Sequence, residues 1–131
     1  MTPACTILLV DDDPALIAVF AMVLQRGGYS VLTAGSAGQA LELLSSHTVS
    51  AIITDLHMPT LEGAGLLAQV AAGKNPIPGI LITGSGELEE QYTNAPGVSA
   101  ILIKPIVNRV LLRTLERVLA KKKGGESSPP K

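Results

Sequence analysis

Hydrophobic and polar residues along this chain form short apolar runs separated by longer amphipathic stretches. The five apolar runs predict strands near Cys5–Val10, Ser30–Ala34, Ala51–Thr54, Ile80–Thr83 and Ala100–Ile103. Short apolar runs are typical of strands that are buried in a parallel sheet, and this holds for four of the five, since Ser30–Ala34 also contains Ser and Thr. The pattern therefore predicts an interior built around five strands.

Amphipathic stretches with helical spacing lie between and after these strands. Asp13 as N-cap and Pro14 at the first helical position predict the start of one helix, which Gly27-Gly28 ends. Ser36 and Gln39 have the spacing of a capping box. Three more helices are predicted, one carrying Leu66, Leu67 and Val70, a short one near Glu87–Asn94 and a last one near Asn108–Lys122. Alternating strands and helices predict an α/β fold with helices on both faces of the sheet.

Four of the apolar runs end in, or are followed directly by, polar side chains that can bind ligands or react with them. These side chains are Asp11-Asp12-Asp13, Asp55, Thr83 and Lys104. Because ligands of open α/β sheets bind beyond the carboxyl ends of the strands, we expect these groups to meet at one edge. Clustered carboxylates favour a hard cation such as Mg²⁺, which prefers oxygen ligands. The strand ends therefore predict a site for a divalent cation and a phosphoryl group.

Each of these side chains also has an ordinary structural explanation. Asp11–Asp13 are compatible with a turn and a helix cap, and Asp13 is best explained as the cap. Asp55 is a candidate nucleophile, because an aspartate carboxylate can accept a phosphoryl group, but alone it could be a turn residue. Thr83 alone would be a strand residue and Lys104 a solvated one. Their shared position at strand ends favours a common site.

The motifs together are specific. The acidic pair Asp11-Asp12, the Asp55-x-x-Met58-Pro59 run with Gly63 behind it, Thr83, and Lys104-Pro105 resemble the receiver domain of two-component response regulators over about residues 5–122. This resemblance implies a doubly wound, flavodoxin-like, five-stranded parallel sheet of order 2-1-3-4-5. A receiver domain is expected over residues 1–123, and the Gly-, Ser- and Pro-rich residues 124–131 predict a disordered tail or linker.

The resemblance also implies a metal-dependent phosphoacceptor. Asp55 would accept the phosphoryl group. Asp12 and Asp55 would bind Mg²⁺ (or Mn²⁺) through their carboxylates, and His57 through its backbone carbonyl. Asp11 would bind the cation through a water molecule, or would contact the ligands and not the cation itself. Thr83 and Lys104 would contact the phosphoryl group as switch residues.

One departure concerns the switch that the resemblance implies. Receivers commonly carry Tyr or Phe three residues before the lysine, whereas Ile101 stands there in this chain. Coupling of an aromatic ring to Thr83 is therefore not expected. Ser85 and His57 would flank the phosphoryl group and tune its lifetime. The Lys104-Pro105 peptide is expected to be cis in this family.

The resemblance implies partners as well. The phosphoryl donor would be a histidine kinase or a histidine phosphotransfer protein, and the output a changed surface around the fourth and fifth helices. A homodimer through the fourth helix, fifth strand and fifth helix is a further hypothesis. Such a protein is not an enzyme, since it promotes only its own phosphorylation and dephosphorylation. Two alternatives remain at this point: a phosphatase of the haloacid-dehalogenase type, which would use the Asp11-x-Asp13 spacing, and a phosphate-independent interaction module.

Composition and charge narrow the class of protein. No apolar run approaches the ~20 residues of a membrane helix, and the first residues lack the pattern of a signal peptide, which favours a cytoplasmic protein. The single Cys5 excludes an intramolecular disulfide. Residues 1–108 carry nine acids and three bases, a balance of −6, whereas residues 109–131 carry seven bases and two acids, a balance of +5.

The basic excess lies on the last predicted helix. Arg109, Arg113, Arg117 and Lys121 recur every four residues and share one face. This face could bind an acidic partner surface, a second copy or nucleic acid, or it could simply be solvated. Direct nucleic-acid binding is not predicted, because no aromatic residues that could stack on nucleobases lie between the Arg and Lys residues of this helix.

Overall fold

The computed structural model describes the main chain of residues 5–56, 63–84, 86 and 91–127, and the side chains of these residues up to 120. Its centre is a sheet of five parallel strands in the order β2-β1-β3-β4-β5. Their bounds are β1 (Thr6–Val10), β2 (Ser30–Ala34), β3 (Ala51–Asp55), β4 (Gly79–Thr83) and β5 (Val98–Ile103). The predicted fold class and strand order are confirmed, and the strand bounds differ from the predicted ones by at most two residues, at the start of β5.

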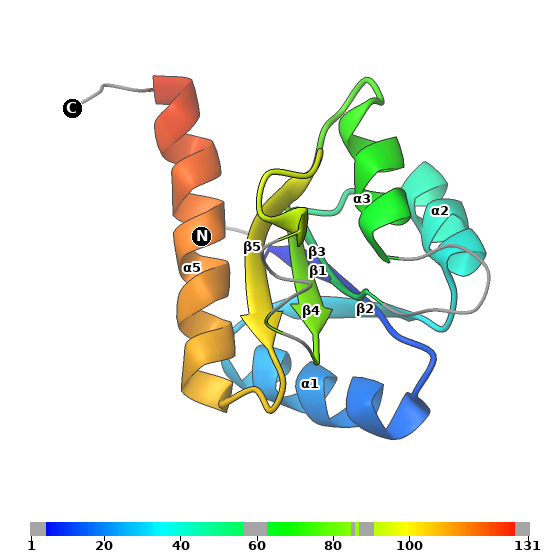
Figure 1. Ribbon diagram of the computed structural model, residues 1–131, viewed down its shortest axis with the longest axis vertical. Coiled ribbons are helices and arrows are strands. Elements are labelled where there is room, and N and C mark those ends of the chain that lie inside the picture. The colour runs from blue at the N-terminus through cyan, green and yellow to red at the C-terminus, as the bar shows by residue number, and fades with distance from the viewer. Residues whose placement is uncertain (1–4, 57–62, 85, 87–90, 128–131) are drawn as a thin grey trace.

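Helices cover both faces of this sheet, as Figure 1 shows. Their bounds are α1 (Pro14–Arg26), α2 (Ala37–Ser46), α3 (Gly63–Ala71) and α5 (Asn108–Ser127). The predicted caps are present: the Asp13 carboxylate accepts hydrogen bonds from the main-chain N–H groups of Ala15 and Leu16, and the Ser36 hydroxyl accepts one from Gln39. Local sequence signals therefore set where α1 and α2 begin.

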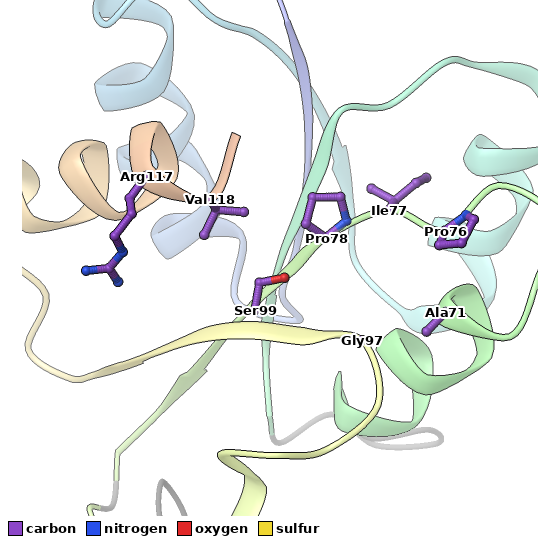
Figure 2. Close-up of a pocket in the computed structure, with 8 residues that line it drawn as sticks. All are labelled: Ala71, Pro76, Ile77, Pro78, Gly97, Ser99, Arg117 and Val118. Atoms are coloured by element: carbon purple, nitrogen blue, oxygen red, sulfur yellow. The ribbon is translucent and has the colours of Figure 1, made fainter. Parts of the chain in front are cut away.

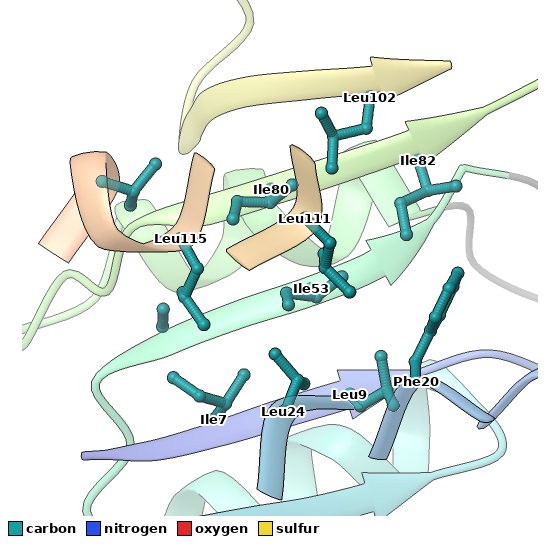
Figure 3. Packing of buried hydrophobic residues seen from close by; sticks show 12 residues of the cluster. Ile7, Leu9, Phe20, Leu24, Ile53, Ile80, Ile82, Leu102, Leu111 and Leu115 are labelled. Atoms are coloured by element: carbon teal, nitrogen blue, oxygen red, sulfur yellow. The ribbon is translucent and has the colours of Figure 1, made fainter. Parts of the chain in front are cut away.

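Alternation of side chains along the strands divides the core into two layers. In β1, Ile7 and Leu9 pack against α1 and α5, whereas Leu8 and Val10 pack against α2 and α3. Figure 3 shows the first layer, in which Leu111 and Leu115 of α5 lie over the central strands. Burial of a Leu or Ile side chain contributes roughly 2 kcal/mol, so these two layers hold the strand ends in fixed positions.

Two predicted elements differ from the structure or fall partly outside it. Residues 87–90 of the short helix predicted near Glu87–Asn94 lie outside the described residues, whereas Gly86, Gln91 and Tyr92 are helical. The last helix was predicted to end at Lys122, but α5 continues to Ser127. Glycine weakens a helix without blocking it, so Gly124-Gly125 permits the continuation, and Pro129 follows soon after. The domain boundary at residue 123 stays a prediction.

Within the described residues, none of the helices combines the length and the apolar character that crossing a bilayer requires.

Candidate functional site at the carboxyl edge of the sheet

The carboxyl ends of β1, β3, β4 and β5 bring the candidate side chains together. Hydrogen bonds between neighbouring strands continue past the last strand residues and hold this edge. The Asp11 N–H donates to the carbonyl of Ala34 (3.1 Å), and the Lys104 N–H donates to the carbonyl of Thr83 (2.8 Å). The backbone that carries Asp11 and Lys104 is therefore hydrogen-bonded to the neighbouring strands, as the sheet itself is.

Three carboxylates meet at this edge. Asp11, Asp12 and Asp55 each place a carboxylate oxygen so that these oxygens all lie within 4.8 Å of one another. Asp11 and Asp55 are only 4% and 7% exposed, whereas Asp12 is open to solvent. A group of oxygen donors with one solvent-facing side fits a hard divalent cation that keeps some of its water.

The Asp11 carboxyl shows the electrostatic cost of this arrangement. Burial raises its pKa above the ordinary value of 3.8, the N–H of Asp13 opposes the rise by donating a 2.9 Å hydrogen bond, and the nearby charge of Asp55 adds to it. Carboxylates held this close repel one another when ionised. A cation bound among them would relieve both the repulsion and the loss of hydration.

Lys104 and Thr83 complete the edge. The Lys104 ammonium lies 3.7 Å from Asp55 Oδ1, with the lysine side chain 40% exposed. An ion pair this exposed contributes at most about 1 kcal/mol to stability. Thr83 is buried at the end of β4. The Lys104-Pro105 peptide bond is cis, as the resemblance implied.

Two features that support Asp55 concern its main chain. The Thr54 hydroxyl donates a buried 3.0 Å hydrogen bond to the Asp55 carbonyl. The Gly63 N–H donates to the carbonyl of Leu56 (2.9 Å), and a Cβ on Gly63 would overlap the Asp55 carbonyl oxygen and lie 3.0 Å from the Thr54 hydroxyl oxygen. The sequence assigned no role to Thr54. Its only signal is a hydroxyl in an otherwise apolar buried run.

The remaining candidates divide into those the structure describes and those it does not. His57, Met58, Pro59 and Ser85 lie outside the described residues. Asp13 caps α1, and this removes the second acid from the Asp-x-Asp spacing of a haloacid-dehalogenase type phosphatase. Ile101 is partly buried and packs against the core layer of α2 and α3.

Comparison with known proteins identifies the family of this chain. Residues 7–116 match the family described as the response regulator receiver domain, and the chain belongs to this family. The chain is 32% identical over 114 residues to the transcriptional regulatory protein GlrR of Escherichia coli K12, which covers 86% of this chain and 26% of that protein. It is 31% identical over 129 residues to the response regulator protein FleR of Pseudomonas aeruginosa, covering 97% of this chain and 27% of that protein. The chain thus spans about a quarter of the length of these two relatives.

Solved structures show the same fold. A CheY-like response regulator receiver domain from Methanospirillum hungatei superposes with a TM-score of 0.85 at 29% identity, covering 94% of this chain and 99% of that one. The chemotaxis response regulator CheY4 of Vibrio cholerae superposes with a TM-score of 0.80 at 29% identity, covering 88% and 99%. The predicted family and flavodoxin-like architecture are therefore confirmed.

Proposed function

We propose that this receiver domain accepts a phosphoryl group on Asp55 in a Mg²⁺-dependent reaction. The observation that supports this most strongly is the environment of the Asp55 carboxylate. It is buried at the end of β3, close to two other carboxylates. It also lies 3.7 Å from the Lys104 ammonium, and among the described residues this is the only ion pair. Phosphoryl transfer depends mainly on positioning and on neutralising charge, and this arrangement favours both.

The transfer needs a donor with a weak bond to phosphorus. An oxygen of the Asp55 carboxylate forms a bond to phosphorus while the P–N bond to a histidine of the donor breaks, and the bonding electron pair stays on the imidazole nitrogen. The product is a mixed anhydride on Asp55. We propose a histidine kinase or a histidine phosphotransfer protein as this donor, and a cytoplasmic location for the encounter.

The residues of the edge have distinct roles in this proposal. Asp12 and Asp55 would hold Mg²⁺ (or Mn²⁺), with the His57 backbone carbonyl as a further ligand, and Asp11 would act through water or without direct contact with the cation. The bound cation would withdraw charge from the phosphoryl oxygens. Lys104 would bind a phosphoryl oxygen, and the Thr83 hydroxyl would donate to another. The domain would act as a switch and not as an enzyme that turns over a separate substrate.

The proposed output surface lies over β5 and the start of α5. Ile103, Val107 and Val110 are exposed apolar side chains there, and they border a hollow of about 180 Å³ next to Ile101. Exposed apolar residues that cluster in this way are typical of interaction surfaces. Lys104 follows Ile103 in the chain and forms the ion pair with Asp55, so it lies between this surface and the phosphoacceptor. Size-exclusion chromatography with light scattering, with and without beryllofluoride, tests whether the output includes a homodimer, and an unchanged monomer would count against it.

The experiment that tests the function is intact mass spectrometry after incubation with acetyl phosphate and Mg²⁺. We expect a gain of about 80 Da, the mass of one phosphoryl group, which needs Mg²⁺ and disappears in Asp55→Asn. Asp13→Asn is the matched control, because asparagine still caps a helix and Asp13 lies outside the three-carboxylate group. Loss of the adduct in Asp13→Asn, or its persistence in Asp55→Asn, would refute the assignment of Asp55.

A further inference from the structure

A hollow of about 400 Å³ opens at the edge of the sheet opposite to the carboxylates (Figure 2). Its wall comes from the segment before β4, from α3, from the start of β5 and from α5. Since β4 is five residues long, the hollow lies about 16 Å from the carboxyl edge. It is therefore a separate feature from the phosphoacceptor site.

The chemical character of the hollow changes from one end to the other. Its lining is Ala71, Pro76, Ile77, Pro78, Gly97, Ser99, Arg117 and Val118. Figure 2 shows Arg117 at the α5 end and Ala71 at the far end, with the proline-containing segment between them. The body of the hollow is thus largely apolar, with Ser99 in its wall, and the α5 end carries the cation of Arg117.

Hydrogen bonds within the chain hold the walls of the hollow in place. Pro78 accepts a 3.0 Å hydrogen bond from the Ile52 N–H, and Gly79 donates one of 3.1 Å to the carbonyl of Gly97. Gly97 has a φ of 81°, and a Cβ there would overlap the Leu67 carbonyl oxygen, so this turn has little freedom to shift. A preformed wall reduces the ordering cost of binding.

The charge of the residues that line the hollow indicates which kind of ligand it favours. Arg117 is exposed and forms no ion pair with any other residue that the structure describes, and the described lining contains no acidic side chain. A guanidinium presents two parallel donors that match a carboxylate. The volume lies in the range of small-molecule sites.

We propose that this hollow binds a small apolar carboxylic acid, with the carboxylate on Arg117 and the apolar body against Pro76–Pro78 and Val118. This binding does not depend on phosphorylation of Asp55. An unphosphorylatable Asp55→Asn protein should therefore bind the acid as tightly as the wild-type protein does, which separates this inference from the proposed function.

The test is a titration of ¹⁵N-labelled protein with 1-naphthoate, followed by amide chemical shifts, beside the neutral analogue 1-naphthalenemethanol. We expect saturable shifts centred on Gly97, Ser99 and Val118 at concentrations up to about 5 mM, with the acid bound about fivefold more tightly than the alcohol. Arg117→Gln should abolish this preference. Arg113→Gln is the matched control, because Arg113 is exposed one turn earlier on α5 and does not line the hollow.

Two results would overturn the proposal. One is the absence of saturable shifts around the hollow in a protein whose spectrum shows a folded domain. The other is an equal loss of preference in Arg113→Gln and Arg117→Gln, which would mean that the general positive charge of α5 attracts the acid. Ser99→Leu gives an independent check, since Ser99 is exposed and a leucine there should occupy the space and weaken both ligands.

Discussion

Replacing Gly63 by alanine tests how closely α3 must approach the phosphoacceptor strand. Gly63 is the first residue of α3 and is buried against the end of β3. A Cβ at this position would overlap the Asp55 carbonyl oxygen and lie 3.0 Å from both the Asp55 carbonyl carbon and the Thr54 hydroxyl oxygen. These neighbours are mainly backbone, so the substitution must move either α3 or the residue that carries the proposed nucleophile.

The expected magnitude follows from the two ways in which this overlap can be relieved. Overpacking of a buried site costs about 1–3 kcal/mol, and we expect Gly63→Ala to lower the free energy of unfolding by about 2 kcal/mol. For a domain of this size that corresponds to roughly 8 °C in Tm. A displacement of Asp55 approaching 1 Å can also slow a positioned reaction by up to about 100-fold. We therefore expect Mg²⁺-dependent labelling by acetyl phosphate to slow at least about tenfold.

Urea unfolding and the rate of the mass gain measure the two effects on the same samples. Gly38→Ala is the matched control, because Gly38 is exposed in α2 and a Cβ there meets nothing within 4 Å. It should raise stability by up to about 1 kcal/mol and leave labelling unchanged. If Gly63→Ala unfolds at the same urea concentration as the wild-type protein and is labelled at the same rate, the inferred close approach does not constrain Asp55.

Three further substitutions probe other parts of the site. Because burial raises the folded-state pKa of Asp11, the unfolded chain releases this proton first and stability falls as pH rises above 3.8. Asp11→Asn should thus be more stable than the wild-type protein in urea at pH 7 without divalent metal, with a smaller difference at pH 4. Lys104→Ala should change the unfolding free energy by at most about 1 kcal/mol yet slow labelling markedly, and equal labelling would exclude a role for the ammonium. Thr54→Val should cost about 1 kcal/mol in urea unfolding through the lost hydrogen bond to Asp55, and an unchanged midpoint would contradict that estimate.

The fold was predictable because its local and global signals agree. The apolar runs of β1 and β3 are too short for helices and are bounded by polar residues, and Asp13 and Ser36 mark helix starts by their own hydrogen-bonding chemistry. The meeting of Asp11, Asp12 and Asp55 also followed from strand ends alone, because parallel strands deliver their last residues to one edge.

Features that depend on how separate elements approach one another were not predictable. The need for glycine at position 63 arises from the distance between α3 and β3, and no local pattern encodes this distance. The support of Asp55 by Thr54 is a contact between main chain and side chain that a strand propensity cannot distinguish from ordinary packing. The hollow near Arg117 draws its wall from residues 71–118, so it exists only in the folded chain.

The position of α5 has a consequence for how the domain forms. Leu111, Leu115 and Val118 of this last helix pack in the same layer as Ile7 of β1 and Phe20 of α1. Contacts between such distant parts of a chain form late, because loop closure must precede them. A nascent chain interrupted before residue 108 would carry all of the proposed site residues, yet it would expose the part of the sheet that α5 covers and leave only α1 on that face. We therefore expect that the domain can be phosphorylated only after α5 has been synthesised, and that an unfinished chain does not react with its phosphoryl donor.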